Sequence, residues 1–190
     1  MPIDRQRFFD VMASFPTGVA IVTTTTRDGV PRGLTTTAVC SISAEPPTVL
    51  VSVDLGSRTL EALRERRTFA VNFIGAGRSD LCLLFASKEH DKFSEVPWQP
   101  GATGLPLLHE DALAWAECTT VHELEVGDHA LLIGLVEDGG VRPELEPPLL
   151  YYRRSWGVWS PVHEAEDGEP VAIRAIEVSG RDLRWQGAEF

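Results

Sequence analysis

The stretch that decides the fold runs from Phe15 to Leu63 and reads FPTGVAIVTTTTRDGVPRGLTTTAVCSISAEPPTVLVSVDLGSRTLEAL. Three segments rich in β-branched residues lie in it, at Val19–Thr26, Leu34–Ser43 and Thr48–Val53. Asp28-Gly29 is typical of a tight turn, and Pro46-Pro47 breaks a strand. The alternation of apolar and charged residues then predicts a short surface helix over Thr59–Arg67. The stretch therefore predicts three strands followed by a helix.

The flanking segments continue this pattern of short strands and few helices. Apolar residues at helical spacing predict a helix over Ile3–Ser14, with Asp4 as a candidate N-cap, and another over Ser79–Ala86. Asp91–Pro106 is rich in Pro, Gly and Trp and is expected to be an ordered loop. Further strands are expected at Thr68–Ile74, Ala112–Val126, Ala130–Glu137 and Leu149–Arg153. Short strands joined mostly by turns indicate a mainly β fold, an antiparallel barrel.

Two of the strands carry more specific expectations. Leu34–Ser43 is long enough for a strand that bends. Thr48–Val53 is apolar almost throughout, which predicts burial on both of its faces. From about Ser160 onward the pattern weakens, although Val171–Val178 regains β-character. We therefore expect one domain over residues 1–159 and a C-terminal extension over residues 160–190.

Composition limits the classes of function. A net charge of -11, from 28 acidic and 17 basic residues, argues against a nucleic-acid or anionic-membrane surface, since both need a basic face. No apolar run approaches the roughly 20 residues that span a bilayer, and the N-terminus lacks a signal-peptide pattern, so we expect a cytoplasmic protein. Cys40, Cys82 and Cys118 are far apart and are expected to be buried thiols rather than metal ligands.

Ser57-Arg58-Thr59 is the strongest candidate for a binding site. It follows a strand and opens a helix, where free amides, hydroxyls and a guanidinium can hold a phosphate. In the alternative interpretation, Ser57 only caps the helix while Arg58 pairs with Glu61 or Glu65. The polar row on the neighbouring strand could meet a flat polar ring and so complete a cofactor site; it comprises Thr35, Thr36, Thr37 and Ser41.

Other candidate motifs are weaker. Gly75-Ala76-Gly77 lacks the third glycine of a dinucleotide-binding turn, since Asp80 stands in its place. His129 is either a solvated turn residue or a hydrogen-bond donor to a nucleotide or a reduced ring. Tyr151 and Tyr152 alternate on a strand, so one of them must face inward. The remaining histidines match no metal motif, and no Ser-His-Asp arrangement is visible.

Taken together, these segments resemble the flavin reductase family with the FMN-binding split-barrel fold. The matching motifs keep the family's order from about Phe8 to Arg154. They are Phe15-Pro16-Thr17-Gly18-Val19, Asp28-Gly29, Pro31-x-Gly33-Leu34-Thr35, Ser41-Ile42-Ser43, Pro46-Pro47, Ser57-Arg58-Thr59, Phe69-Ala70-Val71-Asn72, Phe85-Ala86-Ser87, Asp91-Lys92-Phe93, Gly127-Asp128-His129 and Leu149-Leu150-Tyr151-Tyr152-Arg153.

The resemblance implies an antiparallel split β-barrel with a few short flanking helices, which forms a homodimer with flavin near the subunit interface. The implied cofactor residues are Thr35, Thr36, Thr37 and Ala38 along the isoalloxazine, Cys40 and Ser41 further along the strand, Ser57, Arg58 and Thr59 at the phosphate, Lys92 and Phe93 in the pocket, and Tyr151 near the ring. His129 would stand near the nicotinamide as the candidate catalytic residue. Many relatives carry Asn and Ser where this chain has Thr37 and Ala38, which leaves backbone amides as the ring's main polar partners.

The implied activity is that of a NAD(P)H:flavin oxidoreductase. It would pass hydride from NADH or NADPH to FMN or FAD and supply reduced flavin to a partner flavin-dependent monooxygenase, with no metal. Because hydride transfer needs no protein base, the lack of an obvious catalytic acid or base agrees with it. Two alternatives stay open: a flavin-binding sensor or scaffold without free reductase activity, and a split-barrel enzyme with a diverged substrate.

Overall fold

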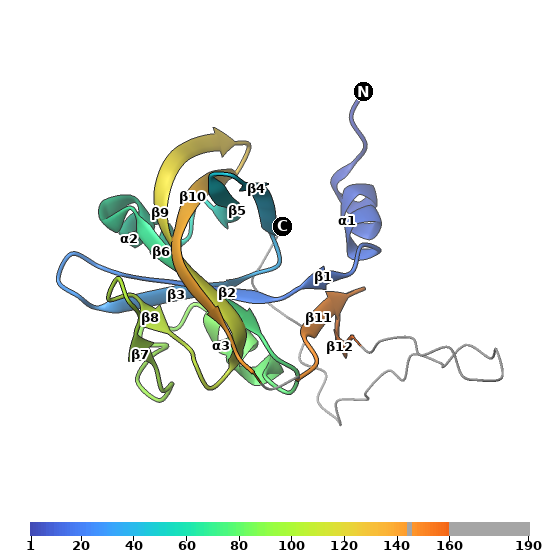
Figure 1. Cartoon of the computed structure of the whole chain (residues 1–190). Coiled ribbons are helices and arrows are strands. Elements are labelled where there is room, and N and C mark those ends of the chain that lie inside the picture. The colour runs from blue at the N-terminus through green and yellow to red at the C-terminus, as the bar shows by residue number, and fades with distance from the viewer. Residues whose placement is uncertain (144–145, 160–190) are drawn as a thin grey trace.

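The computed structural model describes residues 1–143 and 146–159, in which three helices and twelve strands follow one another (Figure 1). The helices are α1 (Arg5–Ala13), α2 (Arg58–Arg66) and α3 (Ser79–Ala86). The strands are β1 (Thr17–Gly18), β2 (Ala20–Thr25), β3 (Pro31–Thr36), β4 (Val39–Ala44), β5 (Pro47–Asp54), β6 (Thr68–Ile74), β7 (Gln99–Pro100), β8 (Pro106–Leu107), β9 (Ala112–Val126), β10 (His129–Val141), β11 (Leu149–Tyr152) and β12 (Ser155–Val158). The expectation of a mainly β, antiparallel fold with few helices is confirmed.

Seven strands form one antiparallel sheet in the order β3-β2-β6-β9-β10-β5-β4. The two edge strands of this sheet, β3 and β4, are consecutive in the chain and are separated only by Thr37 and Ala38. The Ser52 N–H on β5 donates to the Ala38 carbonyl over 3.0 Å, which holds this junction against the sheet. The sheet is strongly curved (Figure 1), so its opposite edges meet at this junction.

Apolar side chains pack on both faces of β2, whose six residues are all buried. Ala20 and Val22 belong to the cluster inside the curved sheet, where Leu60 and Leu63 of α2 also pack. Ile21 belongs to the cluster on the opposite face, with Cys82 and Phe85 of α3. Burial of Leu60 and Leu63 stabilises the fold by about 1.5–3 kcal/mol for each side chain. It fixes α2 on the inner face of the sheet, against β2 and beside β3.

The expectation of one bent strand over Leu34–Ser43 is wrong, because the chain forms β3 and β4 there. A local hydrogen bond accompanies the break. The Thr36 hydroxyl oxygen accepts a hydrogen bond from the Ala38 N–H over 3.0 Å, and such side-chain bonds compete with the strand ladder. The two halves therefore lie at opposite edges of the sheet.

Two expectations about burial are also wrong. On β5, Val51 and Val53 are buried, whereas Leu50 on the other face is only half-buried, so one face alone is fully covered within the single chain. Cys82 and Cys118 are buried, as expected, and burial raises the pKa of each thiol to about 12. Cys40, by contrast, is exposed on β4.

The helices agree with the sequence pattern. α1 begins after Asp4, whose carboxylate accepts a hydrogen bond from the Arg7 N–H over 2.9 Å, as expected for an N-cap.

The loop expected over Asp91–Pro106 contains the short strand β7, and β12 was not expected. The expected extension over residues 160–190, with its β-like segment, lies outside the described residues. No helix of the described chain is both long enough and apolar enough to cross a membrane.

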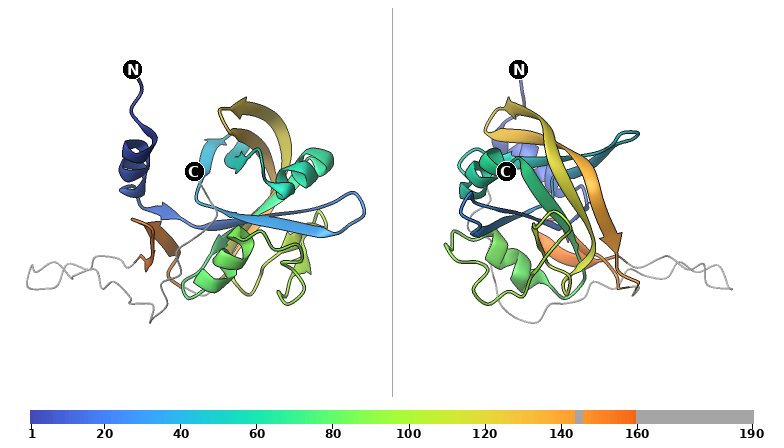
Figure 2. Two further views of the ribbon diagram at one scale, coloured as in Figure 1. Left: turned by 180° about the vertical axis from the view of Figure 1, so that it is seen from behind. Right: turned by 60° about the vertical axis from the view of Figure 1, so that its left-hand side comes forward.

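Two further views show that α1 stands apart from the curved sheet (Figure 2). Its contact with the rest of the chain includes the hydrogen bond from the Arg153 N–H to the Ala13 carbonyl, over 2.8 Å. None of its residues is buried, and the apolar stripe expected from the sequence is left open: Phe8, Val11 and Met12 are each about half exposed.

Candidate functional site

A cleft of about 1460 Å³ runs along the outer edge of β3, between α2 on one side and the end of α3 with its following loop on the other. It brings together most of the side chains that the sequence marked as site residues. Those that line it are Thr35, Thr36, Thr37, Ser57, Arg58, Thr59, Lys92, Phe93, His129 and Tyr151. Ala38, Cys40 and Ser41 do not line it, and Cys40 and Ser41 are exposed on β4.

The start of α2 is more fully hydrogen-bonded than the sequence indicated. The Ser57 hydroxyl accepts from the Thr59 N–H over 3.3 Å as the N-cap, so the capping interpretation holds for Ser57. The N–H groups of Gly56 and Ser57 donate to Asp54, and that of Leu60 donates to the Ser57 carbonyl. An anion at this helix start would therefore depend on side-chain cations more than on free amides.

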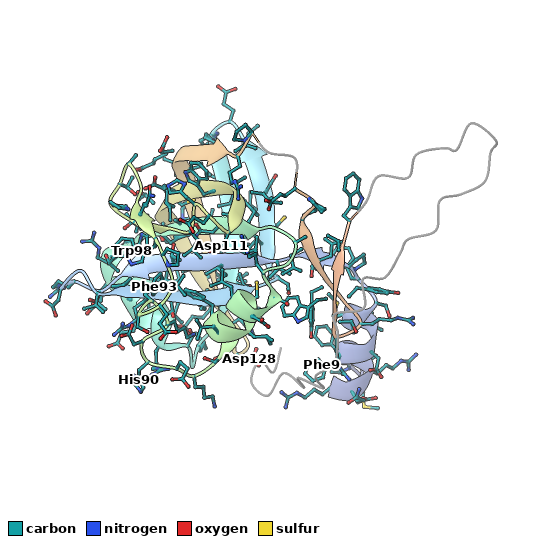
Figure 3. The ribbon with its side chains drawn as sticks, turned by 90° about the horizontal axis from the view of Figure 1, so that it is seen from below. Phe9, His90, Phe93, Trp98, Asp111 and Asp128 are labelled. Carbon is teal, nitrogen blue, oxygen red and sulfur yellow. The ribbon has the colours of Figure 1, made fainter. Side chains whose placement is uncertain are left out.

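Arg58 crosses the cleft and contacts the opposite wall. Its guanidinium donates to the Lys88 carbonyl and to the Glu89 carbonyl, the latter over 3.0 Å. Its Nη1 lies 2.7 Å from the Nδ1 atom of His90, which Figure 3 shows on the loop after α3. The expected alternative, in which Arg58 pairs with a glutamate of its own helix, is wrong. The guanidinium instead joins α2 to this loop.

Lys92 supplies a second positive charge beside Arg58. Its Nζ donates to the Phe85 carbonyl over 2.6 Å and lies 3.4 Å from the Gly33 carbonyl. Burial, with a smaller effect of the Arg58 charge, lowers the pKa of Lys92 to about 8. Across residues 1–143 and 146–159, neither Arg58 nor Lys92 forms an ion pair with a carboxylate. A bound anion would offset the mutual repulsion of these two cations.

The threonine row differs from residue to residue. The Thr35 hydroxyl donates to the Cys82 carbonyl over 2.6 Å, and the Thr36 hydroxyl holds the turn to Ala38. Thr37 lines the cleft, and its hydroxyl makes no hydrogen bond within the part of the chain that the structure describes. Of the three hydroxyls, that of Thr37 is available to a ligand.

The backbone of β3 offers further polar groups. The Gly33 carbonyl accepts from the Thr59 hydroxyl, over 3.1 Å, so it points away from β2. In an antiparallel strand the N–H and C=O of residues two apart point the same way, so those of Thr35 also face the cleft. Gly33 has a packing role as well, because a Cβ there would lie 2.7 Å from the Phe85 ring. The motif glycine lets α3 approach the strand.

Aromatic side chains and His129 complete the lining. The rings of Phe85 and Phe93 meet edge to face at 5.0 Å. Trp98, which does not line the cleft, lies 6.4 Å from Phe93, as Figure 3 shows. Tyr151 lies 5.0 Å from Trp156, and burial raises the pKa of the Tyr151 hydroxyl. His129 Nδ1 lies 2.7 Å from Asp128 Oδ1, and this contact lowers the pKa of Asp128. The imidazole is thereby oriented, with Nε2 left for another partner.

Several lining residues were not identified from the sequence. Arg32, Lys88 and His90 add positive or titratable groups, and Trp156 adds an aromatic face. Arg32 lies within the motif Pro31-x-Gly33, at its variable position, so the motif itself gave no signal. In the described residues, no group of three or more His, Cys, Asp or Glu side chains is placed to hold a metal ion.

The fold and the cleft together define a mainly β protein with a cationic, aromatic groove suited to a phosphorylated ring compound. Residues 12–160 match the family described as flavin reductase like domain. The chain therefore belongs to the flavin reductase-like domain family.

Known relatives agree with this assignment. The chain is 45% identical, over 85% of each chain, to a flavin reductase (NADH) of Kitasatospora aureofaciens. It is 40% identical to a flavin reductase (NADPH) of Lentzea aerocolonigenes, over 80% of this chain and 88% of the relative. The NADH:FAD oxidoreductase SgcE6 of Streptomyces globisporus, solved with NAD and FAD fragments, matches with a TM-score of 0.77 and 32% identity, over 83% of this chain and 94% of that one. Further relatives are reductase subunits or components of monooxygenases, two of which are named as flavin-dependent.

Proposed function

We propose that the protein is a NAD(P)H:flavin oxidoreductase that supplies reduced flavin to a partner monooxygenase. The names of its relatives support this activity and this kind of partner. The observation that carries the proposal is the cleft at the β3 edge, where Arg58 and Lys92 lack a carboxylate partner within the described chain. A phosphate is the ligand group that this pair fits.

The lining residues divide into two sets along β3. Arg58 and Lys92 would hold the flavin phosphate, with Ser57 and Thr59 fixing the start of α2 beside it. The isoalloxazine would lie beside Thr35–Thr37, where outward backbone groups and the Thr37 hydroxyl can meet its polar edge. Hydrogen bonds from the β3 backbone would replace the side-chain hydrogen bonds that many relatives can make at the positions of Thr37 and Ala38. In a single chain the Ala38 backbone bonds Thr36 and Ser52 at the turn, and Ala38 does not line the cleft.

The protein contributes position and charge rather than a proton donor. When both nucleotides are bound, they supply the hydride chemistry themselves. The aromatic lining at Phe93 and Tyr151 would hold the flat rings in register. The Thr35 N–H would stabilise negative charge that develops on the ring, since preorganised donors act strongly in a partly buried site. His129, oriented by Asp128 through Nδ1, would present Nε2 to the nicotinamide nucleotide as a hydrogen-bond acceptor.

We also propose that the sheet is a split barrel and that two chains form a dimer. The meeting of β3 and β4 at Thr37–Ala38 supports the barrel. For the dimer, apolar side chains left open on α1 and just after it, on β4 and at the C-terminal end of β9 support a partner surface. They are Phe8, Val11, Met12, Phe15, Ile42, Leu124 and Val126, each between 46% and 63% exposed. A contiguous exposed apolar stripe, such as Phe8, Val11 and Met12 on α1, is typical of a protein–protein interface.

The proposed activity is tested by the oxidation of NADH or NADPH, followed by absorbance with and without added FMN or FAD. We expect turnover that depends on added flavin. A protein that binds flavin but oxidises neither nucleotide would favour the alternative of a flavin-binding sensor or scaffold. A protein that does neither would contradict the proposed site as well.

A further inference from the structure

The cleft continues past the Arg58–Lys92 pair toward the β2–β3 hairpin, and this part has no role in the function proposed so far. We call it the hairpin arm; it is lined by Thr26, Pro31, Arg32, Glu61 and Glu65. Figures 1 and 2 show the hairpin extending beyond the body of the sheet, with α2 on the same side. The arm is thus an extension of the flavin site rather than a separate pocket.

The position of the arm follows from the middle of β3. The Gly33 carbonyl contacts both Thr59 and Lys92, so the phosphate site lies beside Gly33. Thr35 lies two residues, about 7 Å, to one side along the strand, and Pro31 lies the same distance to the other. A ligand whose phosphate sits at Gly33 and whose ring lies at Thr35 therefore leaves the arm open on the far side of the phosphate.

Helix α2 forms one wall of this arm. It starts beside Gly33, and just past its end the Thr68 carbonyl accepts from the Thr24 hydroxyl over 2.8 Å. Thr24 is the strand partner of Arg32. The helix therefore runs from the outer edge of β3 across β2 to the hairpin end of β6. Its Glu61 and Glu65, four residues apart on one helical face, line the arm.

Arg32 is the cation of the arm. Arg32 is half-buried as a residue, and its guanidinium donates from Nη1 to the Pro31 carbonyl over 3.1 Å. Within residues 1–143 and 146–159 it forms no ion pair, although two glutamates line the same arm. A guanidinium with free N–H groups inside a cleft is suited to a second phosphate.

Along the cleft, Arg58 and Lys92 are followed by Arg32, beside Glu61 and Glu65. This order matches the two phosphates and the adenosine ribose of a dinucleotide flavin. Resting on the proposed function, we propose that the hairpin arm binds the adenosine monophosphate half of FAD, so that the protein prefers FAD to FMN. Arg32 would contact the second phosphate. Glu61 and Glu65 would accept hydrogen bonds from the hydroxyls of the adenosine ribose, and their charge would disfavour a third phosphate group there.

The proposal is tested by the dissociation constants of FAD and FMN, measured by flavin fluorescence titration without any nicotinamide. We expect the wild-type protein to bind FAD at least about tenfold more tightly than FMN, the effect of one charge-assisted contact. Arg32→Gln should remove this preference by weakening FAD alone. Arg27→Gln is the matched control, because Arg27 is exposed on the same hairpin and does not line the cleft.

Three results would overturn the proposal: equal affinity of the wild-type protein for FAD and FMN, a preference that survives Arg32→Gln, or an equal loss of both affinities in that variant. In each case FMN binding by the wild-type protein would leave the proposed reductase function standing. If the wild-type protein bound neither flavin, the proposed function itself would fail, and the hairpin arm with it.

Discussion

Lys92 shows how one residue couples the fold to the site. Its Nζ donates to the Phe85 and Gly33 carbonyls, which joins α3 to β3, while its charge faces that of Arg58. Because burial and the Arg58 charge hold its pKa at about 8, Lys92 is mostly positive at pH 7 and loses its charge above pH 8. A bound phosphate would favour the charged form and raise this pKa.

The affinity for FMN should therefore fall as the pH rises from 7 to 9.5. The phosphate itself keeps its charge over this range, since its second pKa is near 6, so the change reports on the protein. Titrations of FMN at each pH measure the effect. In Lys92→Met the affinity at pH 7 should be lower and nearly independent of pH. A fall of equal size in this variant would show that another group causes it.

Loss of the hydroxyl should have different effects at Thr35 and Thr37. At Thr37 it should weaken flavin binding, and at Thr35 it should lower stability. Thr37→Val should weaken flavin binding by a few-fold, roughly one neutral hydrogen bond, and leave stability unchanged, since the Thr37 hydroxyl bonds nothing in the described chain. Thr35→Val should lower the free energy of unfolding by about 1 kcal/mol, because its hydroxyl donates to the Cys82 carbonyl. Urea unfolding and flavin titration of both variants check the pair.

Among the elements, β3 shows how far the sequence could predict the site. The motif Pro31-x-Gly33-Leu34-Thr35 and the following Ser57-Arg58-Thr59 indicated a strand beside a helix start, and the structure has that arrangement. The sequence did not reveal that the strand ends at Thr36, where the Thr36 hydroxyl accepts a hydrogen bond from the Ala38 N–H. The spacing of apolar residues in the sequence cannot reveal a hydrogen bond of this kind.

The sequence pattern also could not predict which groups Arg58 contacts across the cleft. The helix signal at Ser57 was correct, but Arg58 contacts a loop some thirty residues further along the chain instead of a glutamate one turn away. Local spacing favours pairs within a helix, whereas the choice here depends on how α3 packs against β3. Gly33 lets α3 pack closely on β3, and the loop after α3 then supplies the partners of Arg58.

The hairpin of β7 and β8 should depend on one buried carboxylate. Glu117 on β9 is fully buried and accepts from the Ala102 and Thr103 N–H groups, each over 2.8 Å, and from the Thr103 hydroxyl. Glu117→Gln replaces one acceptor oxygen by a donor, so we expect a loss of about 1–3 kcal/mol in the free energy of unfolding. Urea denaturation measures it.

Glu137→Gln is the matched control, since Glu137 is exposed on the strand that pairs with β9. It should change stability by less than about 0.5 kcal/mol. Equal stabilities of the two variants would contradict the anchoring role of Glu117.

At the scale of the whole molecule, the open apolar stripe of α1 should be the most sensitive part of the proposed dimer. Met12→Glu on this stripe, combined with Phe15→Glu just after the helix, places two charges on side chains that are 47% and 63% exposed in the single chain. We expect the wild-type protein to elute as a dimer and this variant as a folded monomer, because burial of unpaired charge is costly. Light scattering after size exclusion, together with circular dichroism, separates dissociation from unfolding.

A wild-type monomer would contradict the dimer. Gln6→Glu is a control on the solvated side of α1, where Gln6 is exposed and contacts Asp10. It should leave the oligomeric state unchanged.

The whole account depends on a phosphate held between α2 and the loop after α3, and a comparison of FMN with riboflavin, which lacks the phosphate, tests it most directly. Arg58→Ala removes the guanidinium that joins the two walls. We predict that the wild-type protein binds FMN about 10–100-fold more tightly than riboflavin, the effect of charge-assisted contacts, and that Arg58→Ala loses most of this difference. Equal affinities for FMN and riboflavin in the wild-type protein would contradict it.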